Sequence, residues 1–343
     1  MLYATTRNKQ PQFSPMEVLT RQRADDEGFY VPMELPRLSR EEISRFAMKN
    51  PNQALAEILN LFFGCELNRW DVDFAAGRYP IRLTGMVRRI TVTELWHNPD
   101  WHFDRTARDL CARIQGSGGV DEAGDWAYIA VAIGGLFGVF GEMMRDGTAD
   151  MDSPVDIGVP SLDFRLVMAC CYAREMGLPI GTIVICCNEN DNLWNLIRQG
   201  QLRTNLPSVQ TELTECDGCF PEDLERLAHL YGGEAEALKF ARCVREGRSY
   251  FPDDPVLEQF RKGIYVSVVG RSRVESTIGA IFTNHNYVFG PYSALCHGGL
   301  MDYRSRSGAG THALLLSHRG ALCDDRYVAR QLNMAVSALH NML

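Results

Sequence analysis

Two apolar runs on either side of a helical segment constrain the fold of this chain most strongly. Val155 to Val159 and Thr182 to Cys187 are short and rich in β-branched residues, and Asp156 is their only charged residue, which is typical of buried strands. Leu162 to Met176 has the length of a helix, and Gly177 follows it at the position where glycine commonly ends helices. A strand, a helix and a strand in this order form a unit with parallel strands. We therefore expect an α/β protein.

The alternation of strands and helices extends over much of the chain. The expected helices are Ser39 to Phe46, Asn52 to Phe63, Gly218 to Gly232, Val256 to Lys262 and Pro291 to Tyr303, and the further strands are Tyr79 to Leu83, Ile90 to Leu95, Ile264 to Val269 and Thr311 to Ser317. A length of 343 residues allows one large domain or two modest ones. The glycine-rich stretch Gly116 to Gly124 is the best candidate boundary.

Charge and apolar segments argue against several classes of partner. The net charge is −8, the pI is about 5.6, and no run of five Lys or Arg residues occurs, so we expect binding to neither nucleic acid nor an anionic membrane. Trp126 to Gly141 is uncharged but shorter than the roughly 20 residues of a membrane span, so we expect a buried core helix. The first residues lack a secretory signal, and we expect a cytoplasmic protein.

Cysteine usage favours reduced thiols in the core. The chain has eleven cysteines, and the adjacent pairs Cys170-Cys171 and Cys186-Cys187 lie in apolar runs. One CxxC motif, Cys216 to Cys219, has His229 ten residues further on. A zinc site requires more ligands than this, so a turn with two incidental cysteines is favoured.

The stretch from Glu94 to Leu110 is dense in side chains that bind metals. His97, Asp100, His102 and Asp104 are ligand-type residues that a loop can bring together, but their spacing matches no strong metal signature. The alternatives are a metal-assisted site and a remodelled loop whose polar groups satisfy one another.

Ligands of parallel α/β sheets bind beyond the carboxyl ends of the strands, so the turns that follow them are the candidate cleft. Asp163 is positioned to cap a helix, and Arg165 to hold a small anion or form an ordinary ion pair. Asn188 either lines the cleft or forms a polar turn. The full candidate cleft is His97, His102, Asp104, Ser161, Asp163, Arg165, Asn188, Ser317 and His318.

Several segments, in the right order, resemble threonine synthase, a pyridoxal-phosphate (PLP) enzyme of the tryptophan-synthase-β-like fold, fold type II. The longest runs from Val159 to Asp191 and is similar to a family block that begins VPSGNFG, passes MGLPI and ends TNEND. Tyr3 to Arg7 resembles the family's start, Glu27 to Pro32 its DGGLYVP, Glu94 to Pro99 its ELFHGPT, and Gly290 to Ala294 its DPHTA. The resemblance implies a three-layer core with a parallel sheet.

The same resemblance implies that the cofactor lysine is lost. The family continues from ELFHGPT into LAFKD, and without a gap its lysine falls on Asp104 and the next residue on Arg105. The family's phosphate loop PSGNFG becomes Pro160 to Arg165 without its glycines, and Leu316 takes the position of the threonine in STAHP unless the register slips to Ser317. An ionised Asp104 about 6 Å from a phosphate would repel it by roughly 3 kcal/mol per charge pair at an effective dielectric near 20. We therefore expect no cofactor, and PLP only if the alternative below holds.

The resemblance also implies a largely deleted small domain. In the family a glycine-rich loop and the domain around it fill an interval that only Ile114 to Gly124 spans here. We expect an N-terminal region at residues 1–113, a linker at 114–124 and an α/β core domain at 125–343.

Three functions remain open. The first is a non-catalytic threonine synthase-like protein that binds a small metabolite or a protein partner. The second is an active PLP-dependent carbon–oxygen lyase that makes threonine from O-phosphohomoserine, and the third is a metal-assisted activity at the loop from His97 to Asp104. Because a lost module exposes apolar surface, we also expect a homodimer.

Overall fold

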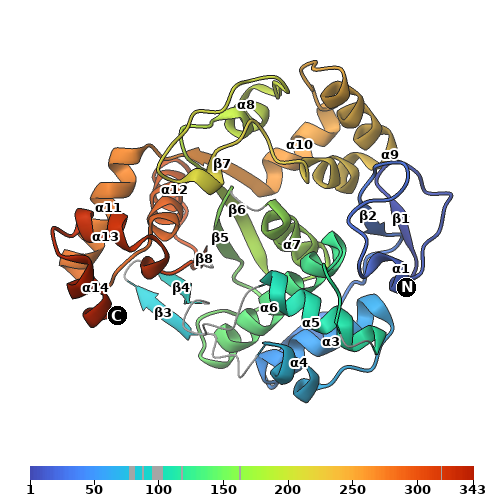
Figure 1. Ribbon diagram of the computed structural model, residues 1–343, viewed down its shortest axis with the longest axis horizontal. Coiled ribbons are helices and arrows are strands. Elements are labelled where there is room, and N and C mark those ends of the chain that lie inside the picture. Colours follow the sequence, from blue (N-terminus) through green and yellow to red (C-terminus); the bar gives the residue numbers. More distant parts are fainter. Residues whose placement is uncertain (77–81, 87–88, 95–102, 117–118, 162–163, 318) are drawn as a thin grey trace.

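The computed structural model describes residues 1–343 apart from 77–81, 87–88, 95–102, 117–118, 162–163 and 318 (Figure 1). Its strands are β1 (Tyr3–Thr5), β2 (Tyr30–Pro32), β3 (Arg82–Met86), β4 (Ile90–Glu94), β5 (Val155–Pro160), β6 (Ile180–Cys187), β7 (Ile264–Val268) and β8 (Ala313–Ser317). Its α-helices are α1 (Pro15–Val18), α2 (Arg40–Phe46), α3 (Pro51–Phe63), α4 (Arg69–Ala76), α5 (Phe103–Gln115), α6 (Asp125–Arg145), α7 (Phe164–Glu175), α8 (Asn192–Gln199), α9 (Leu224–Arg245), α10 (Asp254–Gly263), α11 (Arg271–His285), α12 (Pro291–Ser307), α13 (Asp325–Gln331) and α14 (Val336–Met342).

The main sheet has the strand order β3-β4-β8-β5-β6-β7. Strands β4, β8, β5, β6 and β7 are parallel to one another, whereas β3 pairs antiparallel with β4 at one edge. The expected α/β class is confirmed, and the sheet is mostly rather than wholly parallel. All five parallel strands end at the same edge of the sheet, called here the carboxyl edge.

Helices cover both faces of this sheet. The alternating side chains of β6 divide between two cores: Ile183 and Ile185 pack with residues of α6 and α7, whereas Val184 and Cys186 pack with residues of α11 and α12. Burial on both faces explains why this strand reads as a continuous apolar run. The result is three layers, with α6 and α7 on one face (Figure 1).

Helix α6 is buried on all sides. It is a helix long and apolar enough to cross a membrane, and 89% of its most apolar window is buried inside the molecule, as expected for a core helix. Its glycines allow neighbours to approach closely: a Cβ at Gly138 would lie 3.0 Å from Cβ of Pro51, and one at Gly141 would lie 2.7 Å from the carbonyl oxygen of Phe46.

A local capping signal predicts the start of one N-terminal helix correctly. Helix α2 begins after Ser39, whose hydroxyl accepts from the backbone amide of Glu42 while the Glu42 carboxylate accepts from the amide of Ser39. The strand expected at Tyr79 to Leu83 is observed as β3, from Arg82 on, and residues 79–81 lie outside the described ranges.

The helix expected from Gly218 to Gly232 is wrong in both bounds, since α9 runs from Leu224 to Arg245. The segment before it is a loop, which the side-chain amide of Asn192 holds by donating to the backbone carbonyl of Cys219 at 2.8 Å. Gly233, with φ of 68°, kinks the helix without ending it.

Two expectations about domain organisation stay predictions. The first is the division into residues 1–113, 114–124 and 125–343, and the second is the deletion of the small domain.

Candidate functional site

The carboxyl edge brings together residues that are far apart in the sequence. Glu94 ends β4 beside Ser317 at the end of β8, and Ser161 and Asn188 follow β5 and β6. The backbone amide of Ser161 donates to the carbonyl of Cys186 at 3.0 Å, which ties the first residue after β5 to the neighbouring strand. Ser161, Asn188 and Ser317 of the candidate cleft therefore lie at the carboxyl edge, and their role as a binding site stays a prediction.

Ser161 lines a small cavity of about 120 Å³ beyond β5 and β6. The thiols of Cys187 and Cys216 line the same cavity. Burial raises the pKa of the Cys187 thiol to about 12 and raises that of Cys216 further above its ordinary range. Both thiols are therefore protonated near neutral pH, a state in which cysteine is a poor nucleophile.

Asn188 belongs to a polar turn that holds the end of β6. Its side-chain amide donates to the hydroxyl of Thr211 at 2.9 Å and to the carboxylate of Asp217 at 2.6 Å, and its side-chain oxygen accepts from the backbone amide of Asn190 at 3.0 Å. Asp217 also accepts from the backbone amide of Thr211 at 2.7 Å. These bonds occupy both ends of the Asn188 side chain, which favours the structural alternative over a ligand contact.

Arg165 forms an ion pair with Asp125. Its guanidinium lies 3.6 Å from the carboxylate of Asp125 and 3.7 Å from the ring centroid of Tyr128. The stacking and the ion pair position this side chain against the start of α6.

Glu94 is a buried carboxylate at the edge that the sequence reading missed. Its side chain is 1% exposed, accepts from the hydroxyl of Tyr287 at 2.7 Å and from that of Thr84, and lies 3.5 Å from the guanidinium of Arg82. Burial and this contact raise the pKa of Tyr287. A glutamate that ends a strand of otherwise uncharged residues was the available signal.

The other residues of the candidate cleft cannot be placed as side chains. His97, His102, Asp163 and His318 lie outside the described residues. Asp104 lies in the first turn of α5 and Ser317 ends β8, but only their backbone positions are described.

The metal hypotheses find no support among the described side chains. In that part of the chain, no group of three or more His, Cys, Asp or Glu side chains is arranged to hold a metal ion. All eleven cysteines are free thiols, and Cys219 donates to the carbonyl of Arg203 at 3.2 Å. Residues 95–102 lie outside the described ranges, so a metal site there stays a prediction.

The four lysines of the sequence are all described, and none of them lines the cavity beside Ser161 at the carboxyl edge. Lys49 pairs with Glu57 of α3, and Lys239 of α9 lies 2.5 Å from the carboxylate of Asp253. The backbone amide of Lys9 donates to Glu234 of α9 at 3.2 Å.

Lys262 lies at the opposite edge of the sheet. It lines a cavity with Pro154, just before β5, and Gly181, near the start of β6. Parallel strands begin at this edge, so Lys262 is separated from the carboxyl edge by the length of the strands.

Comparison with known proteins relates the chain to threonine synthases. The family "Threonine synthase N terminus" matches residues 2–74. Threonine synthase-like 1 from Homo sapiens is 24% identical over 157 residues, which cover 45% of this chain and 21% of that protein. Threonine synthase-like 2 from Rattus norvegicus is 21% identical over 398 residues, which cover 86% of this chain and 81% of that protein.

A solved structure shares the fold. PLP-bound threonine synthase from Brucella melitensis superimposes with a TM-score of 0.83 at 18% sequence identity, over 96% of this chain and 91% of that chain. The match to the human relative spans only about a fifth of that protein's length, whereas the fold match spans almost the whole chain.

Proposed function

We propose that this threonine synthase-like chain, which has the N-terminal region and the fold of those enzymes, is a non-catalytic relative that binds a small metabolite or a protein partner without PLP. The contacts of its four lysines, none of which lines the cavity beside Ser161, support this proposal. A PLP enzyme holds its cofactor through a lysine Schiff base, so a chain without a lysine in reach lacks the nucleophile.

The described side chains at the edge do not fit that chemistry. Asn188 is hydrogen-bonded to Thr211 and Asp217, Arg165 is paired with Asp125, and burial keeps the thiols beside Ser161 protonated. We derive no catalytic step from them. We further propose a cytoplasmic homodimer. We also propose that it binds neither nucleic acid nor membranes, and the net charge of −8 supports this last point.

The test is an absorption spectrum of the purified protein with and without added PLP, followed by borohydride reduction and mass spectrometry of the intact chain. We expect no Schiff-base band and no stoichiometric adduct, while a threonine synthase treated in parallel gives both. A stoichiometric adduct mapped to Lys9, Lys49, Lys239 or Lys262 would overturn the proposal and establish the alternative, an active PLP-dependent lyase.

A further inference from the structure

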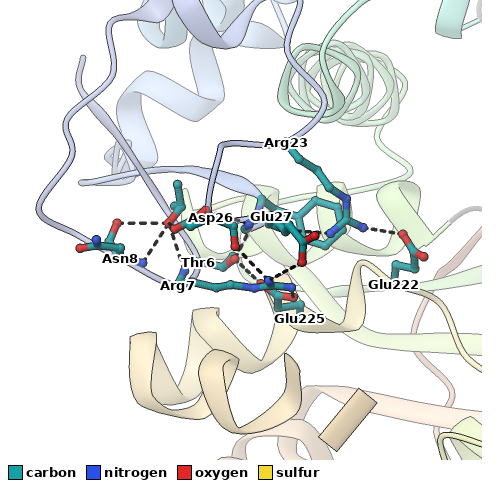
Figure 2. A network of polar contacts seen from close by, with 11 residues as sticks. Thr6, Arg7, Asn8, Arg23, Asp26, Glu27, Glu222 and Glu225 are labelled. Carbon is teal, nitrogen blue, oxygen red and sulfur yellow. Dashed lines mark hydrogen bonds and ion pairs between the residues drawn. The ribbon is translucent and has the colours of Figure 1, made fainter. Parts of the chain in front are cut away.

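A second cavity, of about 560 Å³, lies between the N-terminal segment and α9. Figure 1 shows the β1–β2 ribbon beside α9, and Figure 2 shows the network of polar contacts that lines this cavity. The volume falls within the range of about 300–1,000 Å³ that is usual for small-molecule sites. The cavity is separate from the carboxyl edge, although Phe220 lines both this cavity and the small one beside Ser161.

Two ion pairs in the wall neutralise part of its charge. The guanidinium of Arg7 donates two bonds to the carboxylate of Glu225, at 3.0 and 2.9 Å, and Thr6 donates to the same carboxylate at 2.5 Å. Arg23 pairs with Glu222 and lies over the ring of Phe29 at 3.9 Å. The charges of these two arginines and two glutamates are therefore neutralised within the protein, and the bonds hold the side chains in place.

Positive charge remains at the α9 side of the cavity. Arg242 and Arg245 line it from the last turns of the helix, and both are exposed. Within the described ranges neither guanidinium forms an ion pair with a carboxylate. Arginine at a helix C-terminus is favourable, so the fold tolerates both groups without partners.

Negative charge remains at the opposite turn. The Glu27 carboxylate is 83% exposed and only loosely tied, 3.6 Å from Arg7. The neighbouring carboxylate of Asp26 accepts from the Thr5 hydroxyl at 2.6 Å and from the backbone amide of Gly28 at 2.8 Å, but it has no cationic partner within a described ion pair. Glu27 has φ of 61°, a conformation that glycine or asparagine adopts more readily, so a glutamate is kept there at some cost in backbone energy.

Apolar surface completes the cavity. Leu238, which is 38% exposed, lines it together with Phe220, Phe240 and Val244. The ring of Phe220 meets that of Phe240 edge to face, with centroids 6.0 Å apart. A complementary ligand therefore has a cationic group, an anionic group and an apolar group.

From this arrangement we propose that the cavity binds a free α-amino acid with an apolar side chain. The ammonium group faces the turn of Asp26 and Glu27, the carboxylate faces Arg242 and Arg245, and the side chain lies against Leu238 and Phe220. Arginine is suited to carboxylate recognition because its planar fork donates two parallel bonds. This site goes beyond the proposed function, and its test gives an answer whether or not PLP binds at the carboxyl edge.

The test is isothermal titration calorimetry of the full chain with L-phenylalanine and L-leucine, and with two analogues of phenylalanine, 3-phenylpropanoate and 2-phenylethylamine. We expect saturable binding of at least one amino acid and at least about tenfold weaker binding of both analogues, since each lacks one of the two charges. Equal binding of 3-phenylpropanoate would mean an anion site instead and would overturn the zwitterion assignment.

Variants locate the site. The double substitution Arg242→Gln and Arg245→Gln, and separately Glu27→Gln, should each weaken binding about tenfold or more. Arg248→Gln is the matched control, because Arg248 is also exposed and near the end of α9 but pairs with Glu246 and does not line the cavity. The proposal fails if no amino acid binds the wild-type chain, or if Arg248→Gln weakens binding as much as the double variant while all proteins keep the wild-type melting temperature.

Discussion

At the scale of single residues, Glu222 and Glu225 show how burial affects the contribution of an ion pair to stability. Glu225 and Glu222 each pair with an arginine of the N-terminal segment (Figure 2). The side chain of Glu225 is 3% exposed, whereas that of Glu222 is 78% exposed. Contact with Glu225 raises the pKa of Arg7.

We predict that Glu225→Gln lowers the free energy of unfolding by about 3 kcal/mol, because it leaves the Arg7 guanidinium without its buried counter-charge. Glu222→Gln is the control and should cost at most about 1 kcal/mol, since an exposed pair is screened by water. Urea unfolding at neutral pH measures both. Equal losses in the two variants would contradict the role given to burial.

His229 gives the protein a predictable sensitivity to acid. Burial, assisted by Lys9, lowers its pKa from 6.5 to about 4, and within the described residues its Nε2 has no hydrogen-bond partner. The unfolded chain therefore takes up a proton near pH 6.5 that the folded protein accepts only near pH 4. This contribution to stability is fully present above about pH 6.5 and is lost as the pH falls towards 4.

We predict that protonation of His229 lowers the free energy of unfolding by up to about 3 kcal/mol as the pH falls from 7 to 4, since each pKa unit corresponds to about 1.36 kcal/mol. His229→Gln should show a smaller fall over this range. Some fall remains in the variant because the pKa of His312 is also lowered. Urea unfolding at several pH values compares the two proteins, and parallel curves would rule out the assignment to His229.

At the scale of elements, Gly141 of α6 and Gly279 of α11 differ in how closely other atoms pack around them. A Cβ at Gly141 of α6 would lie 2.7 Å from the carbonyl oxygen of Phe46, whereas a Cβ at Gly279 of α11 would meet nothing within 4 Å. The first glycine is required by packing between helices, and the second is not.

We predict opposite signs for the same substitution at these two sites. Gly141→Ala should destabilise the protein by about 1–3 kcal/mol, because a backbone carbonyl must move. Gly279→Ala should stabilise it by about 0.5–1 kcal/mol, because alanine restricts the unfolded chain and favours helix. Thermal unfolding of both variants checks this, and a stabilising Gly141→Ala would show that α6 does not pack as described.

At the scale of the whole molecule, two exposed aromatic side chains of α4 bear on the predicted association of two chains. Trp70 and Phe74 lie one turn apart on α4 and are 72% and 82% exposed. Large exposed apolar side chains that share a face commonly mark contacts with other chains.

We predict a homodimer, with a mass twice the 38.6 kDa of the chain, in light scattering at micromolar concentration. Association buries apolar surface that the single chain leaves in water. A mass of one chain at that concentration would contradict this prediction.

Much of the sheet was predictable because its signals are local. The apolar runs that became β5 and β6 are buried on both faces, so nearly every residue carries the signal, and Ser39 with Glu42 marks the start of α2 through contacts three residues apart. The start of α9 was misplaced because Gly218 to Pro221 are held as a loop by Asn192, a residue 27 positions before Cys219. No local pattern contains such a contact.

The sequence by itself determined the α/β class and the number and chain positions of the lysines, because periodicity and residue identity are properties of the chain alone. Tertiary structure alone decided which of those positions meet. It placed Lys262 at the far edge of the sheet, closed the Asn188 turn with Asp217, and set Arg242 and Arg245 across a cavity from Glu27, more than two hundred residues away. The physical reason is that charge pairing and burial depend on distance in space, which residue order does not specify.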